Sequence, residues 1–322
     1  MKKIAIFCGG YSSEFDISMK SADTILNALP KDYDSFLVVV TKKGWTVDYK
    51  GVESPINMND LSFVHKGEIQ KIDIGLVYIH GNPGENGKIQ AFLEMKGLPC
   101  VNSGALASEL SFDKWYCNQF LRGFDINVAK SIRLTLNSSY DSRKIIDQLG
   151  LPIFVKPCDS GSSFGISKVK ELSELKGAII AAQKEGESIV LESMLNGTEV
   201  TCGVYRAGGG IIALPLTEIV SHGDFFDYDA KYLGKSEEIT PARVSEEITK
   251  KVQEVSKKAY SLLNLRSISR IDFMIVDGEP FIIEVNTTPG FSAASIVPKM
   301  LSVASISIPD FWSSILKEEL PQ

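Results

Sequence analysis

Residues 269–286, SRIDFMIVDGEPFIIEVN, restrict what this chain can fold into more than any other segment. Apolar and polar residues alternate on both sides of Asp277-Gly278, which is typical of two antiparallel strands with one buried face. A two-residue turn would place Asp272 on the same face as Ile283 and bury a charge. A three-residue loop, 276–278, avoids this, so we expect that loop. The expected core face holds Ile271, Phe273, Ile275, Phe281, Ile283 and Val285.

The opposite face of this hairpin carries Arg270, Asp272, Glu284 and Asn286. Two carboxylates and an amide oxygen on a rigid hairpin suit Mg²⁺ that bridges nucleotide phosphates. An arginine there can stabilise a developing phosphoryl or acyl oxyanion. The alternative is a solvated sheet face with an ordinary ion pair. Four such residues, followed by the segment 287–290 (TTPG), favour the metal and phosphate site.

A second segment, FVKPCDSGSSFGISKV (154–169), combines Lys156 with a glycine- and serine-rich stretch. Glycines let the backbone approach a phosphate closely, and successive N–H groups bind anions. The P-loop spacing GxxxxGK[ST] is absent. An ordinary Gly/Ser-rich hairpin turn is an equally good interpretation of this segment alone.

A third segment, VLESMLNGTEV (190–200), is an apolar strand that ends at Glu192, with Glu199 seven residues later. Its backbone groups could bind adenine and its carboxylates could bind ribose hydroxyls. Without context, a strand and turn with solvated acids explains this segment better.

The first third of the chain alternates strand-like and helix-like segments, which predicts a parallel sheet. The expected strands are Ile4–Phe7, Phe36–Val40 and Gly75–Ile79, with a helix over 18–29. Ligands of such sheets gather at the carboxyl ends of strands, where Gly9-Gly10 and His80-Gly81 stand. Farther along, we expect helices at 115–121, 142–149, 172–185 and 246–263, and strands at 153–157, 189–192, 199–205 and 211–214.

Composition excludes several classes of protein. The chain has 322 residues, and 34 basic against 40 acidic side chains give a net charge of −6. At about 100–200 residues per domain, we expect two or three domains. No Lys/Arg-rich run indicates a nucleic-acid or membrane surface, and no stretch approaches the ~18 apolar residues of a membrane helix. Five cysteines without a CxxC pair, and an N-terminus that reads as a strand rather than a signal peptide, predict a cytoplasmic location.

In this order, the three segments resemble the ATP-grasp fold, in which a glycine-rich loop and a carboxylate hairpin close around ATP. Four more segments are similar to D-alanine–D-alanine ligases: GGYSSEFDIS (9–18), HGNPGENGKIQ (80–90), FFDYDAKY (225–232) and EVNTTPGFSAASIVP (284–298). The resemblance implies an α/β (α+β overall) architecture. An N-terminal parallel α/β domain would precede two α+β domains that clamp ATP, with bounds 1–102, 103–195 and 196–322.

The resemblance also implies roles for single residues. Glu14 is expected to bind the ammonium of the first D-alanine, Ser162 and Tyr232 to hydrogen-bond with it, and Ser295 to bind the second carboxylate. Arg270 and the Gly290 N–H are expected at the tetrahedral oxyanion. Lys114, Lys156 and Lys231 are expected at the ATP phosphates, and Glu192, Ser193, Leu195, Glu199 and Met274 around adenine and ribose. Asp272, Glu284 and Asn286 are the expected ligands of two Mg²⁺ ions.

The implied reaction is the ligation of two D-alanine molecules to D-alanyl-D-alanine, for peptidoglycan precursors. ATP would phosphorylate the first carboxylate, and the second amine would displace phosphate. Because an acyl phosphate hydrolyses in water, we expect a closing lid and assign it to the long segment 222–241. Mn²⁺ in place of Mg²⁺, a monovalent cation and a homodimer are also compatible with the resemblance.

Three alternatives stay open: a ligase that makes another D-amino-acid dipeptide or D-alanyl-D-lactate, another ATP-grasp ligase, and a non-catalytic nucleotide-binding protein. Tyr232 favours the dipeptide, while Glu14 and Ser295 argue against other ATP-grasp ligases. The chain departs from the family at Asn86 (usually Asp), Ala91 (usually Gly) and Phe226 (usually Tyr), which removes no metal or phosphate ligand. His80 and Glu85 are expected either to orient the first substrate or to hold the turn after their strand.

Overall fold

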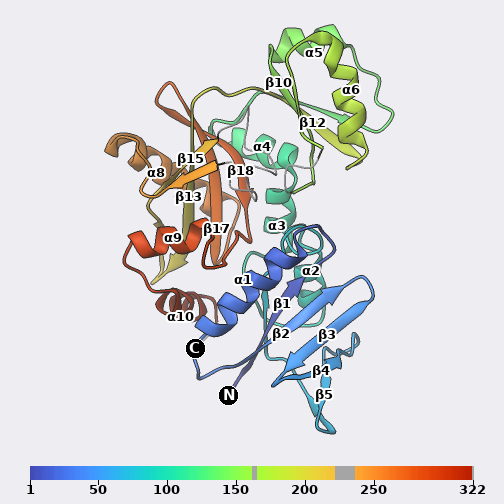
Figure 1. The fold of residues 1–322 in the computed structure, drawn as a ribbon, viewed down its shortest axis with the longest axis vertical. Helices are drawn as coiled ribbons and strands as arrows, with labels where there is room; N and C mark the ends of the chain where they lie inside the picture. Colours follow the sequence, from blue (N-terminus) through green and yellow to red (C-terminus); the bar gives the residue numbers. More distant parts are fainter. Residues whose placement is uncertain (162–164, 222–235, 321–322) are drawn as a thin grey trace.

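The computed structural model describes residues 1–161, 165–221 and 236–320. Three main sheets follow one another along the molecule (Figure 1). The N-terminal sheet lies at the bottom of the view, the sheet from the middle third at the top, and the C-terminal sheet between them. The sequence of sheets in space therefore differs from their sequence in the chain, and the first and last thirds become neighbours.

The N-terminal sheet has the order β4-β3-β2-β1-β7-β8. Four of its strands pair in parallel, as the alternation of strands and helices predicted: β1 (Lys3–Gly9), β2 (Asp34–Thr41), β7 (Ile74–Val77) and β8 (Cys100–Val101). β3 (Gly44–Tyr49) and β4 (Val52–Pro55) add an antiparallel edge, and β5 (Phe63–His65) pairs with β6 (Glu68–Gln70). The helices are α1 (Phe15–Ala28) and α2 (Lys88–Met95).

The middle sheet is antiparallel, with the order β11-β10-β12-β9. Its strands are β9 (Ser131–Thr135), β10 (Ile153–Pro157), β11 (Ser167–Val169) and β12 (Ser188–Ser193), with helices α5 (Ser142–Leu149) and α6 (Leu172–Gln183). Its buried apolar cluster runs only from Leu134 to Leu191. This sheet and its two helices therefore bury their apolar side chains among themselves.

The C-terminal sheet has the order β16-β15-β13-β17-β18, with β14 also paired to β13. Its strands are β13 (Thr198–Ala207), β14 (Gly210–Ala213), β15 (Thr217–Ser221), β16 (Ser236–Ile239), β17 (Ile268–Val276) and β18 (Glu279–Asn286). The accompanying helices are α8 (Glu246–Leu262), α9 (Ile296–Val303) and α10 (Ile308–Glu319), and α3 (Ala105–Phe112) and α4 (Lys114–Arg122) lead from the N-terminal sheet to the middle sheet.

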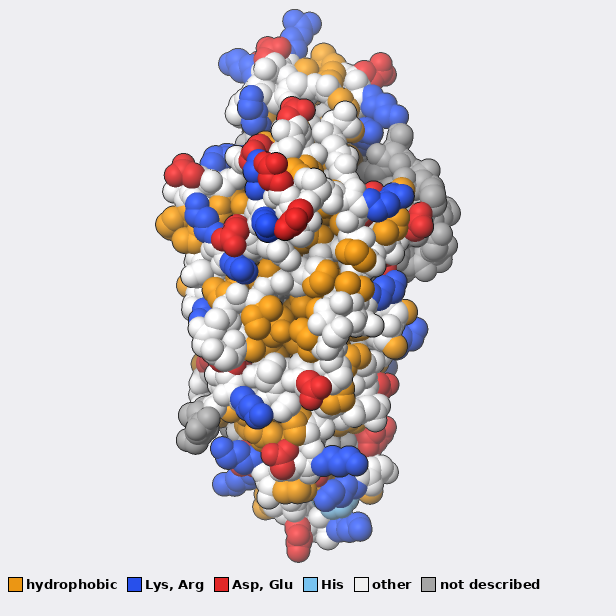
Figure 2. Space-filling view, turned by 90° about the vertical axis from the view of Figure 1, so that its left-hand side faces the viewer, with side chains coloured by type: hydrophobic (Ala, Val, Ile, Leu, Met, Phe, Trp, Pro, Cys, Tyr) orange, Lys and Arg blue, Asp and Glu red, His pale blue; other side chains and the backbone are white. Residues whose placement is uncertain are grey.

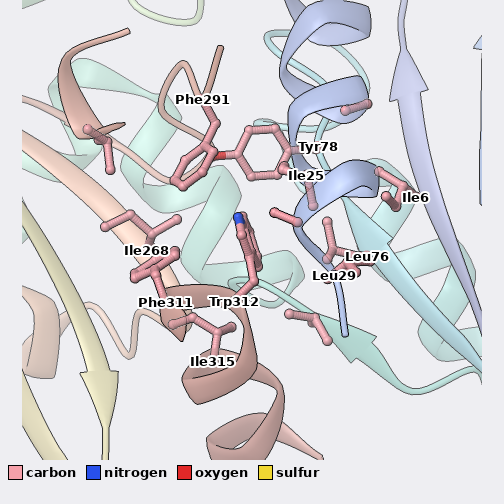
Figure 3. Close-up of a cluster of buried hydrophobic side chains, with 14 of the residues drawn as sticks. Ile6, Ile25, Leu29, Leu76, Tyr78, Ile268, Phe291, Phe311, Trp312 and Ile315 are labelled. Carbon is pink, nitrogen blue, oxygen red and sulfur yellow. The ribbon is translucent and has the colours of Figure 1, made fainter. Parts of the chain in front are cut away.

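One apolar core joins the first and last thirds of the chain. Figure 3 shows Tyr78, Ile25 and Leu76 meeting Phe291 and Trp312. The Tyr78 hydroxyl, which is fully buried, donates to the Pro289 carbonyl at 2.7 Å. Since buried aromatic area dominates such cores, the N-terminal and C-terminal sheets form one packed body.

The predicted three-residue loop of the 269–286 hairpin is wrong. Val276 pairs with Glu279, so the turn has two residues, and both Asp277 (φ 50°) and Gly278 (φ 80°) are left-handed. That geometry matches the twist of the strands, which is why Asp-Gly favours it. The charge burial that argued against this turn is avoided by a bulge: the register shifts after Asp272, which then lies opposite Glu284.

The bulge also changes which apolar residues are buried. Ile282 becomes a core residue opposite Phe273, whereas Phe281, predicted in the core, lies opposite Met274 on the polar face. Ile283, also predicted in the core, is only partly buried. The prediction that Arg270, Asp272, Glu284 and Asn286 share one face is confirmed, because Arg270 lies opposite Asn286 and Asp272 opposite Glu284.

On the face of the molecule in Figure 2, acidic and basic side chains are mixed, and hydrophobic side chains gather near the middle. Among the described residues, no helix is long and apolar enough to cross a membrane.

Candidate active site

A cavity of about 440 Å³ is lined by parts of the chain that are far apart in the sequence. Six residues predicted as site residues line it: Glu14, Arg270, Glu284, Asn286, Gly290 and Ser295. The glycine-rich segment reaches the same place, because Gly161 also lines the cavity. A Cβ on Gly161 would lie 3.0 Å from a carboxylate oxygen of Glu14, so this backbone passes directly over that side chain.

The hairpin fixes the orientation of Arg270. Its Nε and Nη2 donate to the two oxygens of Asp272 at 2.9 and 3.0 Å, a bidentate pair. Asp272 also accepts from Asn286 Nδ2 at 3.0 Å and from the Thr201 hydroxyl at 2.5 Å. The strands on either side of β17, which are β13 and β18, thus each contribute one polar side chain that holds Asp272. The guanidinium is placed at the wall of the cavity.

Lys114 connects the hairpin to the glycine-rich segment. Its Nζ lies 3.0 Å from Glu284 Oε1 and donates to the Ser160 carbonyl at 2.7 Å. Burial alone would lower the pKa of Lys114. The charge and hydrogen bond of Glu284, with Glu192 and Glu85, outweigh burial and raise that pKa above its ordinary value. Lys114 therefore stays a cation between the two segments.

Lys156 and Glu192 form an ion pair on the middle sheet, with Nζ 2.7 Å from Oε2 and both side chains almost fully buried. Asn118 Nδ2 donates to the other Glu192 oxygen at 2.7 Å. Glu199 lies opposite Met274 across β13 and β17. The segment between Glu192 and Glu199 holds the partly buried Ser193 and Leu195. It approaches the hairpin closely, since a Cβ on Gly197 would lie 1.8 Å from the Ile275 carbonyl oxygen.

The segment that follows β7 brings two more ionisable groups to the cavity, His80 and Glu85. Burial lowers the pKa of His80 against the opposing charge of Glu14, and its Nε2 lies 3.3 Å from the Ser21 hydroxyl. Burial, and then the charge of Glu14, raise the pKa of Glu85 to about 7, although the Gly81 N–H donates to it at 2.8 Å. Glu85 therefore titrates near neutral pH.

Gly290 and Ser295 meet where α9 begins. Ser295 is the N-cap residue of that helix, and its hydroxyl lies 2.9 Å from the Ser292 hydroxyl. A Cβ on Gly290 would lie 3.1 Å from the Ser295 hydroxyl. The Gly290 backbone, the Ser295 hydroxyl and Arg270 thus border one space.

The chemistry of the hairpin donors fits magnesium. Asp272, Glu284 and Asn286 offer oxygen atoms from one face of two paired strands. Within the described parts of the chain, no group of three His, Cys, Asp or Glu side chains is spaced to hold a metal. A site here therefore depends on the Asn286 amide in addition to the two carboxylates.

Ser162, Lys231 and Tyr232, together with most of the predicted lid, lie outside the described residues. Several cavity-lining side chains were not predicted from the sequence: Ile17, Lys20, Ser111, Phe112, Glu238 and Ile296. Ile17 and Lys20 follow Glu14, the N-cap residue of α1, at intervals of three residues, so helical spacing could have indicated them. Glu238 comes from a short strand with no distinctive pattern.

A glycine-rich segment that meets a carboxylate hairpin across one cavity defines the ATP-grasp class of ligases, as the sequence predicted. Family models narrow this class. The model described as D-ala D-ala ligase N-terminus matches residues 3–103, and the model described as D-ala D-ala ligase C-terminus matches residues 120–317. The chain therefore belongs to the D-alanine–D-alanine ligase family.

Curated relatives agree over the whole chain. A D-alanine–D-alanine ligase of Flavobacterium johnsoniae is 45% identical, covering 99% of this chain and 100% of its own length. One of Parabacteroides distasonis is 43% identical, covering 99% and 98%.

Solved structures confirm the fold. A D-Ala:D-Ser ligase from Enterococcus faecalis has a TM-score of 0.89 at 30% identity, and coverage is 99% of both chains. A D-alanyl-alanine synthetase A from Vibrio cholerae also has a TM-score of 0.89, at 29% identity and coverage of 99% and 98%. A Bacillus anthracis D-alanine–D-alanine ligase complexed with ATP has a TM-score of 0.80 at 26% identity, covering 98% and 97%. The fold is thus common to ligases with different second substrates.

Proposed function

We propose that this chain joins two D-alanine molecules to D-alanyl-D-alanine, with conversion of ATP to ADP and phosphate. The observation that carries the proposal is the single cavity where Glu14, Arg270 and Ser295 meet, in a chain 45% identical over 99% of its length to a D-alanine–D-alanine ligase. The product is a dipeptide for peptidoglycan precursors, made in the cytoplasm.

The first half of the reaction takes place between Glu14 and the hairpin. Glu14 binds the ammonium of the first D-alanine, and the carboxylate of this D-alanine points toward the ATP γ-phosphate. Lys114 and Lys156 hold the phosphates, with Lys231 as a third cation by resemblance, and Glu192, Ser193, Leu195, Glu199 and Met274 surround adenine and ribose. Because phosphoryl transfer is mostly positioning and charge neutralisation, two fixed cations suit this step, Lys156 within the glycine-rich segment and Lys114 in contact with its Ser160 carbonyl.

Asp272, Glu284 and Asn286 are the proposed ligands of two Mg²⁺ ions, for which Mn²⁺ could substitute. When bound, Mg²⁺ neutralises charge on the phosphate oxygens. Lys114 contacts Glu284 at 3.0 Å, so the same carboxylate would orient a phosphate-binding lysine.

The second half takes place between Arg270 and α9. Ser295 binds the carboxylate of the second D-alanine, which directs its amine at the acyl phosphate carbonyl. Arg270 and the Gly290 N–H stabilise the tetrahedral oxyanion, and phosphate leaves. Asp272 holds the guanidinium in place beforehand, so no reorganisation is needed when the charge develops. Ser162 and Tyr232 complete the proposed site by resemblance.

The test measures phosphate release and products by mass, with ATP, Mg²⁺ and D-alanine, L-alanine, D-alanine plus D-serine, or D-alanine plus D-lactate. Release that depends on D-alanine, with the D-alanyl-D-alanine dipeptide as main product, supports the proposal. The E. faecalis neighbour makes D-serine the second candidate acceptor. Preferential formation of D-alanyl-D-serine or the D-lactate ester would keep the mechanism and refute the substrate, and ATP binding without any release would refute catalysis.

A pair of hairpin variants tests the assigned residues. Glu284→Gln is expected to lower kcat at least a hundredfold, because it removes a metal ligand and the partner of Lys114. Glu279→Gln, at the exposed turn of the same hairpin, is the matched control and is expected to leave kcat unchanged. Equal kcat values would remove Glu284 from the proposed site.

The bounds 1–102, 103–195 and 196–322 remain our proposed domain division, and a homodimer remains a prediction. Limited proteolysis and light scattering, respectively, test them.

A further inference from the structure

An ion pair joins the edge strand β16 to α9 beside the cavity. Lys299 Nζ lies 2.8 Å from Glu238 Oε2. Glu238 lines the cavity, whereas Lys299 is absent from the described residues that do so. A negative side chain thus faces the cavity, and the cation that neutralises it approaches from the helix behind.

The same helix carries Ser295. Lys299 stands four residues after Ser295, and its backbone N–H donates to the Ser295 carbonyl. Ser295 and the next residue, Ile296, line the cavity together with Glu238. The Glu238–Lys299 pair therefore lies at the end of the cavity where Ser295 is placed.

Charge at this end matters for a substrate that carries a carboxylate. The acidic side chains lining the described cavity are Glu14, Glu85, Glu238 and Glu284, against the basic side chains Lys20 and Arg270. Glu284 has Lys114 beside it, and Glu14 is assigned to an ammonium. Without its partner, Glu238 would repel an incoming carboxylate. One uncompensated charge beside a binding site changes the affinity on the order of tenfold.

We propose that Lys299 is a positioning residue for the second D-alanine. By neutralising Glu238, it lets the acceptor carboxylate approach the Ser295 hydroxyl, although Lys299 itself does not touch the substrate. This inference rests on the proposed function, because it takes the Ser295 end of the cavity as the acceptor subsite.

The test separates charge from structure with one double variant. Initial rates over a range of D-alanine concentrations are fitted with one KM for each D-alanine subsite. Lys299→Met should raise the acceptor KM about tenfold and leave the donor KM and the KM for ATP unchanged. Adding Glu238→Gln to Lys299→Met removes the uncompensated charge and should return the acceptor KM to within about threefold of the wild type. The effect of Lys299→Met should also shrink at high salt.

Lys251→Met is the matched control, because Lys251 Nζ forms a 2.8 Å pair with Glu279 away from the cavity and has similar exposure. It should leave both KM values unchanged, and equal unfolding midpoints would show that all variants fold. An acceptor KM that is unchanged in Lys299→Met, or that stays high in the double variant, would overturn this inference. Failure of the wild type to form a dipeptide would instead overturn the proposed function.

Discussion

Two interfaces in this molecule differ in polarity. The N-terminal and C-terminal sheets share one apolar core, in which Tyr78 and Leu76 from one side pack against Phe291 and Trp312 from the other. The middle sheet has a core of its own, confined to residues between Leu134 and Leu191. It meets the rest of the molecule through polar side chains.

The polar contacts gather around α4, which lies between the middle sheet and the hairpin. Lys114 contacts Glu284 and the Ser160 carbonyl, and Asn118 donates to Glu192. Between β9 and α4, the Arg133 guanidinium lies 5.5 Å from the Trp115 ring centroid. Lys114, Asn118 and Glu192 are almost fully buried, so they depend on one another and on the backbone for polar partners, and a charged substrate offers alternative partners.

The two interfaces therefore have different roles, because the apolar one stabilises the fold and the polar one arranges groups for the proposed reaction. The apolar interface sets the relative position of Glu14, Arg270 and Ser295. Glu14 is the N-cap residue of α1, whereas Arg270 lies on β17 and Ser295 is the N-cap residue of α9, on the other side of that interface. The polar interface brings Lys114 and Lys156, which we propose bind phosphate, to those residues. Changes to the first interface should act on unfolding, and changes to the second on kinetics.

The largest expected effect on stability follows from Trp312→Ala. Trp312 is fully buried, and removing it from the shared core should cost about 3–5 kcal/mol of unfolding free energy. Trp115→Ala, in the polar interface, is the matched control and should cost about 1 kcal/mol. Urea unfolding measures both. Equal losses would show that the two interfaces do not differ as described.

Lys114→Met should have the converse effect. It removes the cation between Glu284 and the Ser160 carbonyl, so kcat/KM for ATP should fall about a hundredfold. Because Glu284 stays partly exposed, the unfolding free energy should fall by only about 1–3 kcal/mol. Lys250→Met, which breaks an exposed pair with Glu246, should change neither quantity. A Lys114→Met protein with normal kinetics but poor stability would reverse the assignment of this interface.

The apolar interface could not have been predicted from the sequence pattern. Helical spacing shows that α1 and α10 each have an apolar face, but it does not show that Ile25 and Trp312 share a core. The elements with strong local signals were predicted well: 142–149 and 153–157 have the bounds that the structure gives α5 and β10. Short strands such as β16, which carries Glu238, have no such signal.

The hairpin shows where sequence reasoning fails in detail. Alternation located the polar face that holds Asp272 and Glu284, but it gave the wrong turn. The sequence conflict between an Asp-Gly turn and the position of Asp272 is resolved by a bulge after Asp272, and packing of Ile282 against the core selects it. A contact between Glu14 and the glycine-rich segment was expected, through Ser162, from resemblance alone, because no periodicity connects residues so far apart.

Arg133→Met should produce a small, local effect. Arg133 Nη2 donates to the Ser188 hydroxyl at 2.7 Å, and the guanidinium lies over Tyr116 as well as Trp115. Its loss should cost about 0.5–1 kcal/mol. Hydrogen exchange should become faster for amides of β9 and α4 and stay unchanged for those around Tyr78. Faster exchange at Tyr78 would show that the two interfaces are coupled.

The last effect depends on pH and involves Glu85, on the N-terminal side of the polar interface. Its folded pKa of about 7 exceeds the ordinary value of 4.5, mainly because of burial and then the charge of Glu14. The native state therefore holds this proton between those values. The stabilisation is complete below about pH 4.5 and is lost as pH rises through 7. Unfolding midpoints without nucleotide or divalent cation should thus fall across this window in the wild type relative to Glu85→Gln, which does not titrate there. Parallel pH profiles for the two proteins would mean that Glu85 is already ionised in the native state, and that the polar interface tolerates its charge beside Glu14.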